Sequence, residues 1–258
     1  MEQSKRRQYL IKALLKENGL QDKETELPGT EEEQKRWLRG LMNVRMPKAV
    51  NAEFEKIQDE YLQEELAKKG IVQVADLQPL QPGLYLWRGD ITHLAVDAIV
   101  NAANSGMLGC FVPCHGCIDN AIHSAAGIQL RQECARIMQK QQEPEPTGRA
   151  KITPAYNLPC RYVLHTVGPI VSGRLTEKHC RQLADCYRSC LELAADNGVK
   201  SIAFCCISTG EFHFPQEEAA KIAVRTVKDF MHTDQRMERV VFNVFKQEDY
   251  DIYQKLLG

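Results

Sequence analysis

Three cysteines and a histidine crowd one stretch of this 258-residue chain, GCFVPCHGCIDNAIHSAAG at residues 109–127. Cys110, Cys114, His115 and Cys117 fall within eight consecutive positions, and an aspartate follows where a helix is expected to begin. Zinc prefers thiolate sulfur and imidazole nitrogen, a Cys–His pair can also form a nucleophile, and small buried thiols can simply pack. The residue types therefore leave three interpretations open: a metal site, a nucleophile or a structural loop.

Composition narrows the class of protein. Lys and Arg number 33 and Asp and Glu 34, so a formal net charge of −1 offers no broad positive field for nucleic acid or acidic membranes. No apolar run approaches the roughly 20 residues of a membrane span, and the start of the chain lacks a signal-cleavage pattern. The ten cysteines lie mostly in apolar periodic segments, which favours reduced thiols. We therefore expect a cytoplasmic protein without nucleic-acid or membrane partners.

The pattern of apolar residues divides the chain in two. Residues 1–70 are charged and space their apolar side chains by three and four positions, which predicts a helical extension packed on the main body. Helices are expected over residues 4–19, 30–42 and 47–70, with a Pro-Gly turn at residues 28–29. Residues 71–258 form the predicted main domain.

Short β-rich runs alternate with helical periodicity in the main domain. Strands are expected over residues 84–92, 95–104, 149–159, 161–169, 201–209 and 239–245. Helices are expected over residues 176–198, 215–232 and 247–257. This alternation predicts an α/β fold with a mixed, mostly buried sheet, in which ligands bind at the strand ends.

Two loops combine a preceding strand, glycine and a following helix start. One is the cysteine-containing stretch, and the other is ISTGEFHFP at residues 207–215. Backbone N–H groups and the helix dipole bind phosphate in such loops. Two loops of this kind predict a ligand with a diphosphate.

Five motifs in this order resemble the macrodomains, a family that binds ADP-ribose. They are GDIT (89–92), DAIVNAAN (97–104), IDNAIHSAAG (118–127), YVLHTVGP (162–169) and ISTGEFHFP (207–215). The similarity spans about residues 82–257 and implies a macrodomain-like three-layer α/β/α sandwich.

The cysteine-containing stretch departs from the common macrodomain pattern, which has a run of glycines there. Its pattern C-F-x-P-x-H-x-C-x-D-N-x-I-H resembles a zinc-dependent branch of bacteria and fungi. Bacterial members of that branch carry an N-terminal helical extension and accompany a sirtuin-like ADP-ribosyltransferase. The resemblance implies Zn²⁺ held by Cys110, His115 and Cys117, and hydrolysis of ADP-ribose from mono-ADP-ribosylated protein, expected at acidic side chains.

Cys114 leaves a second arrangement open. A fourth cysteine ligand would close the tetrahedron and make the zinc structural, whereas three ligands leave a position for water or substrate. We favour Cys114 as a bystander because adjacent Cys114 and His115 side chains do not easily converge on one ion. A closed site would suit a non-catalytic ADP-ribose reader, and the near-neutral charge disfavours a nucleic-acid-binding module.

The resemblance also implies roles around the ligand. Asp119 and Asn104 are expected to act in catalysis, with Asp119 placing a water or a ribose hydroxyl, and Asn101 and Asn104 are expected at the distal ribose. Asp90 is expected to accept a hydrogen bond from the adenine amino group, with Ile91 beside the base. Helix capping by Asp119, and turn formation by Asp90 and both asparagines, remain the simpler alternatives.

The 207–215 loop and two aromatic residues complete the predicted site. Backbone donors to the diphosphate are expected at Ser208, Thr209, Gly210 and Glu211. Phe212 is expected over the distal ribose and Phe245 against adenine, although both are equally explicable as core aromatics. Zinc would act as a Lewis acid at the anomeric end, Asp119 would place the water, and the loops would fix the orientation.

Packing is the expected role of the other candidate side chains. His123 shares a helical face with Asp119 and is predicted to be a packed, hydrogen-bonded histidine. His165 alternates with apolar neighbours and is predicted to be a core histidine. Core packing is also expected for Cys134, Cys160, Cys180, Cys186, Cys190, Cys205 and Cys206.

Overall fold

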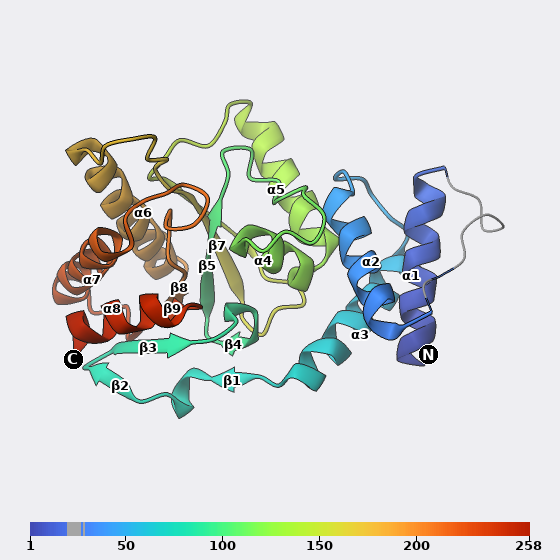
Figure 1. Ribbon diagram of the computed structural model, residues 1–258, viewed down its shortest axis with the longest axis horizontal. Coiled ribbons are helices and arrows are strands. Elements are labelled where there is room, and N and C mark those ends of the chain that lie inside the picture. Colours follow the sequence, from blue (N-terminus) through green and yellow to red (C-terminus); the bar gives the residue numbers. More distant parts are fainter. Residues whose placement is uncertain (20–26, 28) are drawn as a thin grey trace.

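A seven-stranded mixed sheet forms the centre of the computed structural model, which describes residues 1–19, 27 and 29–258 (Figure 1). The order is β2 (Pro79–Gln81), β3 (Leu84–Arg88), β9 (Arg239–Val244), β8 (Ser201–Phe204), β5 (Ala98–Ala103), β7 (Tyr162–Val167) and β6 (Ala150–Pro154). Strands β3 to β7 in this order pair in parallel, whereas β2 and β6 are antiparallel edges. Two short parallel strands, β1 (Val72–Gln73) and β4 (Leu94–Ala95), form a separate pair.

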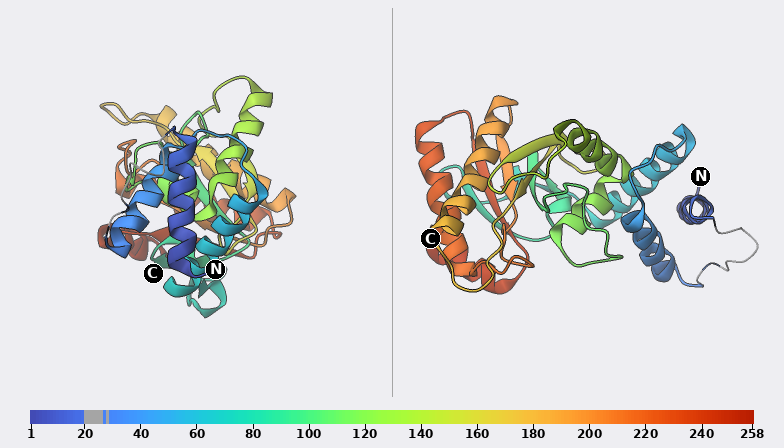
Figure 2. Two further views of the ribbon diagram at one scale, coloured as in Figure 1. Left: turned by 90° about the vertical axis from the view of Figure 1, so that its right-hand side faces the viewer. Right: turned by 90° about the horizontal axis from the view of Figure 1, so that it is seen from above.

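Helices cover both faces of the sheet. On one side α6 (Glu177–Asp196), α7 (Gln216–Thr233) and α8 (Gln247–Leu257) lie together, and on the other lie α4 (Ile118–Ala126) and α5 (Ile128–Gln141) (Figures 1 and 2). The central strands are buried on both faces; Ile99, Val100 and Ile202, for example, are fully buried. The predicted three-layer α/β/α sandwich with a mixed sheet is therefore confirmed.

The register of the central strands brings the two glycine-containing loops together. Strand β5 pairs in parallel with β8, with Val100 opposite Phe204. Parallel strands present their carboxyl ends at the same edge of a sheet. The loop after β5 and the loop after β8 therefore leave the sheet side by side.

The N-terminal extension forms a helical bundle beyond α4 and α5, made of α1 (Gln3–Glu17), α2 (Glu31–Val44) and α3 (Ala52–Lys69) (Figure 1). A capping box between Thr30 and Glu33 begins α2, as the sequence predicts, and the Asn51 side chain caps α3. Buried apolar residues of the three helices form a core of their own, and Ile128 of α5 enters it. The extension thus packs on the main domain, as expected.

Some elements differ from those expected. Helix α5 was not predicted, because its buried face includes Arg131 among Ile128, Leu130 and Cys134 and so breaks the apolar pattern. The expected strand at residues 149–159 ends at Pro154, since proline cannot donate a ladder hydrogen bond and β6 is an edge strand. The predicted Pro-Gly turn lies partly outside the described residues, because Pro28 is not among them.

All ten cysteines are unpaired. Among those expected to pack, four are buried and three are partly buried: Cys134, Cys186, Cys190 and Cys205, then Cys160, Cys180 and Cys206. Cys160 lies in the turn between β6 and β7, so its packing does not come from a helix or strand pattern. In the part of the chain that the structure describes, no helix combines the length and apolarity needed to cross a bilayer.

Candidate active site

The loop between β5 and α4, residues 104–117 and hereafter the metal loop, brings three predicted ligands together. One ligand atom each of Cys110, His115 and Cys117 lies within 4.8 Å of the others, and all three residues are partly buried. Two sulfurs and one imidazole nitrogen form a donor set that suits zinc and leaves a fourth tetrahedral position free. These three residues could therefore hold one zinc ion.

His115 has a ring nitrogen that lacks a protein partner. Its Nδ1 is buried and has no hydrogen-bond partner among the described residues, whereas Nε2 lies 3.7 Å from Oε1 of Glu211. A buried unpaired nitrogen is costly, and metal-binding histidines commonly direct their other nitrogen at a carboxylate. Both features fit a histidine that binds metal through Nδ1, and they link the metal loop to the 207–215 loop.

Cys114 faces away from the three candidate ligands. Its backbone has a left-handed φ of 54°, and its Sγ donates to the backbone oxygen of Arg36 on α2 at 3.2 Å. The Cys114 amide also donates to Oδ1 of Asn43 at 2.9 Å. This orientation agrees with the bystander interpretation, and the four-ligand site is not formed in this arrangement.

Cys117 begins α4 as well as contributing to the cluster. Its Sγ accepts a hydrogen bond from the Asn120 amide at 3.4 Å, in the position of a helix N-cap. Burial, together with the nearby Cys110 and Asp119, raises the pKa of the Cys117 thiol to about 11. A thiol with this pKa is protonated at neutral pH and is a poor nucleophile. Metal binding requires the same thiol to lose its proton, so what favours the metal-site interpretation is the convergence of three donor atoms in one cluster.

Asp119 lies on the first turn of α4 and is buried. Its carboxylate accepts hydrogen bonds from Nδ2 of Asn101 at 2.8 Å and Nδ2 of Asn104 at 3.3 Å. Burial raises the pKa of Asp119 to about 6, and the two asparagines oppose that rise. The capping alternative is wrong, because Cys117 caps the helix and Asp119 points at the end of β5.

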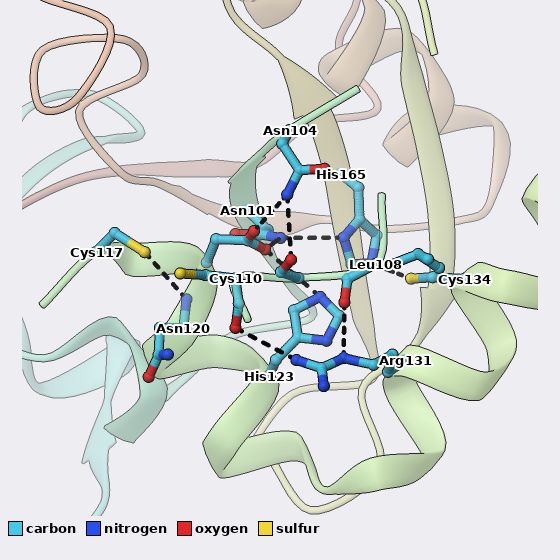
Figure 3. Close-up of polar contacts among 12 residues, drawn as sticks. Asn101, Asn104, Leu108, Cys110, Cys117, Asn120, His123, Arg131, Cys134 and His165 are labelled. Atoms are coloured by element: carbon cyan, nitrogen blue, oxygen red, sulfur yellow. Dashed lines mark hydrogen bonds and ion pairs between the residues drawn. The ribbon is translucent and has the colours of Figure 1, made fainter. Parts of the chain in front are cut away.

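The two asparagines of DAIVNAAN occupy different environments (Figure 3). Asn101 is fully buried, with its Nδ2 3.2 Å from Nδ1 of His165, so its side chain supports Asp119 from behind and does not reach an open ribose site. Asn104 is exposed at the end of the strand, where its Oδ1 accepts from the Gly106 amide at 3.0 Å. Asn104 is therefore placed to meet a ligand, and the expected ribose contact of Asn101 does not fit its burial.

Two buried histidines lie below the carboxylate. His165 is fully buried between Asn101 and Thr153, whose Oγ1 lies 3.0 Å from Nε2, and the predicted core role is confirmed. His123 is also buried, but the expected hydrogen bond is not formed: neither ring nitrogen has a partner among the described residues, and Nε2 lies 3.5 Å from Oδ1 of Asp119. Gly109, with φ of 78°, packs its Cα against the His123 ring, since an added Cβ would lie 2.8 Å from it.

The residues expected at adenine lie around the end of β3. Asp90 accepts from the amide and hydroxyl of Thr92 at 3.0 and 2.7 Å, and its side chain is 38% exposed. Ile91 is 1% exposed and lies in the core, so the expected position of its side chain beside the base does not fit its burial. Phe245 is 79% exposed, and the alternative that it is a core aromatic is therefore wrong.

The 207–215 loop folds back on itself. The Phe214 amide donates to the Ser208 oxygen at 2.9 Å, and the Thr209 hydroxyl donates to the Cys206 oxygen at 3.2 Å. Phe212 is partly buried, and its oxygen accepts from the Val171 amide at 2.9 Å. A Cβ at Gly210 would meet open space. The loop is ordered by these contacts, and its role as a diphosphate cradle stays a prediction.

Sequence reasoning missed residues that hold the metal loop from outside. Arg131 of α5 donates to the backbone oxygens of Leu108 and Cys110 at 2.7 and 3.4 Å (Figure 3). Arg39 of α2 donates to the backbone oxygen of His115 at 3.1 Å. Neither arginine could be linked to the metal loop from the sequence, because each lies far along the chain from the residues that it contacts.

Comparisons with known proteins agree with this architecture. The Macro domain family model matches residues 100–223. A relative from Treponema medium, named Protein-ADP-ribose hydrolase, is 58% identical over 100% of both chains. A protein of the same name from Staphylococcus aureus (strain MRSA252) is 45% identical over 97% of this chain and 94% of that protein.

Solved structures show the same similarity. A Trypanosoma brucei macrodomain in complex with ADP-ribose is 34% identical, with a TM-score of 0.68, over 83% of this chain and 93% of that chain. The match extends beyond one motif to nearly the whole of the solved domain. The chain therefore belongs to the macrodomain family.

Proposed function

We propose that this protein is a zinc-dependent hydrolase that removes ADP-ribose from mono-ADP-ribosylated protein, at acidic side chains, and releases free ADP-ribose. The observation that carries the proposal is the cluster of Cys110, His115 and Cys117. Cys117 lies two positions before Asp119, whose carboxylate is buried. Relatives at 58% and 45% identity are named Protein-ADP-ribose hydrolase, and a similar solved structure holds ADP-ribose. These findings support an ADP-ribose ligand and hydrolytic chemistry.

The protein's own residues would divide the work of binding and reaction. Asn104, at the exposed end of β5, would contact the distal ribose, and the 207–215 loop would hold the diphosphate by backbone amides. Asp119 would orient the attacking water and hold its proton, since burial raises the pKa of this carboxyl to about 6 and makes it a better proton acceptor than an ordinary aspartate. When bound, zinc supplies a Lewis acid at this end of the site.

Asn101 and His165 would act by positioning Asp119. The 2.8 Å hydrogen bond from Asn101 holds one carboxylate oxygen, and His165 in turn contacts the Asn101 amide. Neither side chain is open to solvent. A fixed carboxylate needs little reorganisation when the bond to the sugar breaks.

Two further features complete the proposal. The resemblance to the zinc-dependent branch supports a sirtuin-type ADP-ribosyltransferase as the enzyme that produces the substrate. Ten unpaired cysteines suit a reducing compartment, which supports a cytoplasmic location.

The alternative is a reader that binds ADP-ribose without turnover. It needs a closed structural zinc site, which would require Cys114 as the fourth ligand. The Cys114 sulfur instead donates to the Arg36 oxygen on α2. The geometry therefore supports the hydrolase over the reader.

The test uses a protein mono-ADP-ribosylated on glutamate and aspartate, with a label in the adenylate moiety. Purified protein is analysed for zinc and incubated with this substrate before chelation, after chelation and after zinc is restored. We expect labelled ADP-ribose to be released by the zinc-loaded protein, lost on chelation and regained with zinc. A parallel substrate modified on arginine separates ester hydrolysis from cleavage of a nitrogen linkage.

Each outcome bears on a separate part of the proposal. Retention of the label by zinc-loaded protein that still binds ADP-ribose would favour the reader. Equal hydrolysis before and after chelation would remove the zinc requirement but keep the hydrolase. Release from arginine alone would contradict the acidic-side-chain specificity.

A further inference from the structure

We propose that helix α2 of the N-terminal extension is part of the metal site, and that Arg39 is a positioning residue that sets its affinity for zinc. The inference deepens the proposed function and rests on its zinc-binding part. It assigns a role to the extension, because side chains from α2 hold the metal loop from outside while the candidate ligands face inward.

Arg39 contacts the metal loop and the start of α4 at once. Its Nη2 donates to the backbone oxygen of His115 at 3.1 Å and to Oδ1 of Asn120 at 2.7 Å, and its Nε donates to the same Oδ1 at 3.1 Å. A planar guanidinium with donors at fixed angles restricts both partners in a way that a flexible ammonium does not. The carbonyl of a candidate ligand is therefore fixed from the extension.

Asn120 carries this restraint to the rest of the loop. It is fully buried; its Nδ2 donates to the Val112 oxygen at 3.0 Å, and its amide donates to Sγ of Cys117 at 3.4 Å. One residue thus joins Arg39, the middle of the metal loop and a second candidate ligand. Loss of Arg39 would leave the Asn120 oxygen in a buried place with its main donor removed.

Asn43 and Arg131 add independent links between α2 and the loop. Asn43 is 1% exposed; its Oδ1 accepts from the Cys114 amide and its Nδ2 donates to the Ser124 hydroxyl, both at 2.9 Å. Arg131 donates through Nη1 to the oxygens of Met42, Asn43 and Arg45 at 3.3, 2.6 and 2.6 Å.

The same Arg131 side chain also donates to the loop oxygens of Leu108 and Cys110. Its guanidinium therefore joins the C-terminal end of α2 to the backbone of the metal loop at Leu108 and at the candidate ligand Cys110. Contacts that involve the extension thus hold the metal loop around Leu108 and Cys110 and again at Cys114 and His115. Groups that orient metal ligands typically contribute 10–100-fold to metal affinity.

The experiment measures zinc affinity by competition with a chelator of known affinity, in the full chain. Arg39→Ala is expected to weaken zinc binding by about 10–100-fold and to lower kcat at limiting zinc, while ADP-ribose affinity, measured by calorimetry, stays unchanged. Arg39→Lys keeps the charge but not the fork, and an intermediate affinity is expected. Arg36→Ala is the matched control, since it removes the same charge from an exposed position of α2.

The outcomes separate this inference from the proposed function. Wild-type protein that binds no zinc would overturn both the inference and the zinc-dependent part of the proposed function. Wild-type protein that binds zinc, with Arg39→Ala equally tight, would overturn the inference and leave the function intact. If Arg39→Ala does not fold, as judged by its melting curve, Arg39→Lys decides: weaker zinc binding supports the inference, and unchanged binding overturns it.

Discussion

Asn101 Nδ2 lies 2.8 Å from Oδ1 of Asp119, so the end of a buried strand holds the carboxylate on the first turn of α4. Asn104, three residues further along, donates to the other carboxylate oxygen at 3.3 Å. Both oxygens are thus directed by amides from one strand end. The orientation of the Asp119 carboxylate is therefore fixed by the protein itself, without a bound ligand.

Asp119→Asn tests this arrangement, because it keeps the shape of the side chain and removes its negative charge. We expect kcat for release of ADP-ribose to fall by about 10²–10⁴-fold, the usual contribution of a general acid or base, with ADP-ribose affinity retained. Single-turnover hydrolysis and calorimetry measure the two quantities. Turnover at the wild-type rate would reduce Asp119 to a structural role.

The cysteines of the metal loop provide a matched pair. Cys117→Ala should abolish stoichiometric zinc and lower turnover by several orders of magnitude, because the cluster loses one of three ligands. Cys114→Ala should keep zinc near one ion per chain, since its sulfur faces the Arg36 oxygen. Metal analysis of both variants decides the matter, and zinc loss in Cys114→Ala would instead indicate a four-ligand site.

Ile128 tests how the extension is attached. It is 6% exposed and lies in the core formed by the extension helices, although it belongs to α5. Ile128→Ala should lower the free energy of unfolding by about 2–5 kcal/mol through lost burial and the cavity left behind. Ile170→Ala, at a position 57% exposed, should change it by less than about 0.5 kcal/mol. Urea denaturation of both variants makes the comparison, and equal losses would contradict the packing described.

Burial of His165 predicts a dependence of stability on pH. Desolvation lowers the pKa of His165 to about 3, whereas an unfolded histidine has a pKa of about 6.5. The unfolded state therefore binds more protons between these values. The contribution of His165 to the free energy of unfolding should therefore fall by up to about 1.4 kcal/mol for each pH unit below 6.5 and should not change above it. Asp119, whose pKa is raised by burial, contributes in the opposite direction.

Urea unfolding of metal-free protein between pH 5 and 7.5 tests this dependence, without competition between protons and metal. His165→Gln should make the slope shallower, and the slope that remains includes His123, whose pKa is also lowered by burial. His232→Gln, at an exposed position, should leave the slope unchanged. An unchanged slope in His165→Gln would contradict the assignment.

Local sequence patterns predicted the strands with continuous apolar runs and the helices with a recognisable N-terminal cap. The capping box of Thr30 and Glu33 marked the start of α2, and the apolar runs marked the central strands. Helix α5 was not predicted because Arg131 lies on its buried face. The Arg131 guanidinium donates hydrogen bonds to backbone oxygens of two segments that are distant in sequence. From the sequence alone, a buried arginine whose hydrogen-bond partners are distant in the chain cannot be distinguished from an exposed arginine.

The candidate site was predictable to a similar degree. Spacing and the family pattern predicted three candidate ligands, and their donor atoms lie close together in the structure. The contact between Cys114 and Arg36 could not be predicted, because the two residues are 78 positions apart. Asn101 and Asn104 look equivalent in the motif, yet one lies inside the sheet and the other beyond its end. Only the length of β5, which ends at Ala103, distinguishes them.

Gly109 has a consequence for how far this sequence can vary. Its Cα presses on the His123 ring, and a Cβ there would come within 2.8 Å of it, in a backbone conformation with φ of 78°. Any bulkier residue would displace either the His123 ring or the loop backbone next to Cys110, and its own backbone would be strained at this positive φ. The geometry of the candidate site thus depends on a position that has no side chain as well as on the side chains that line it.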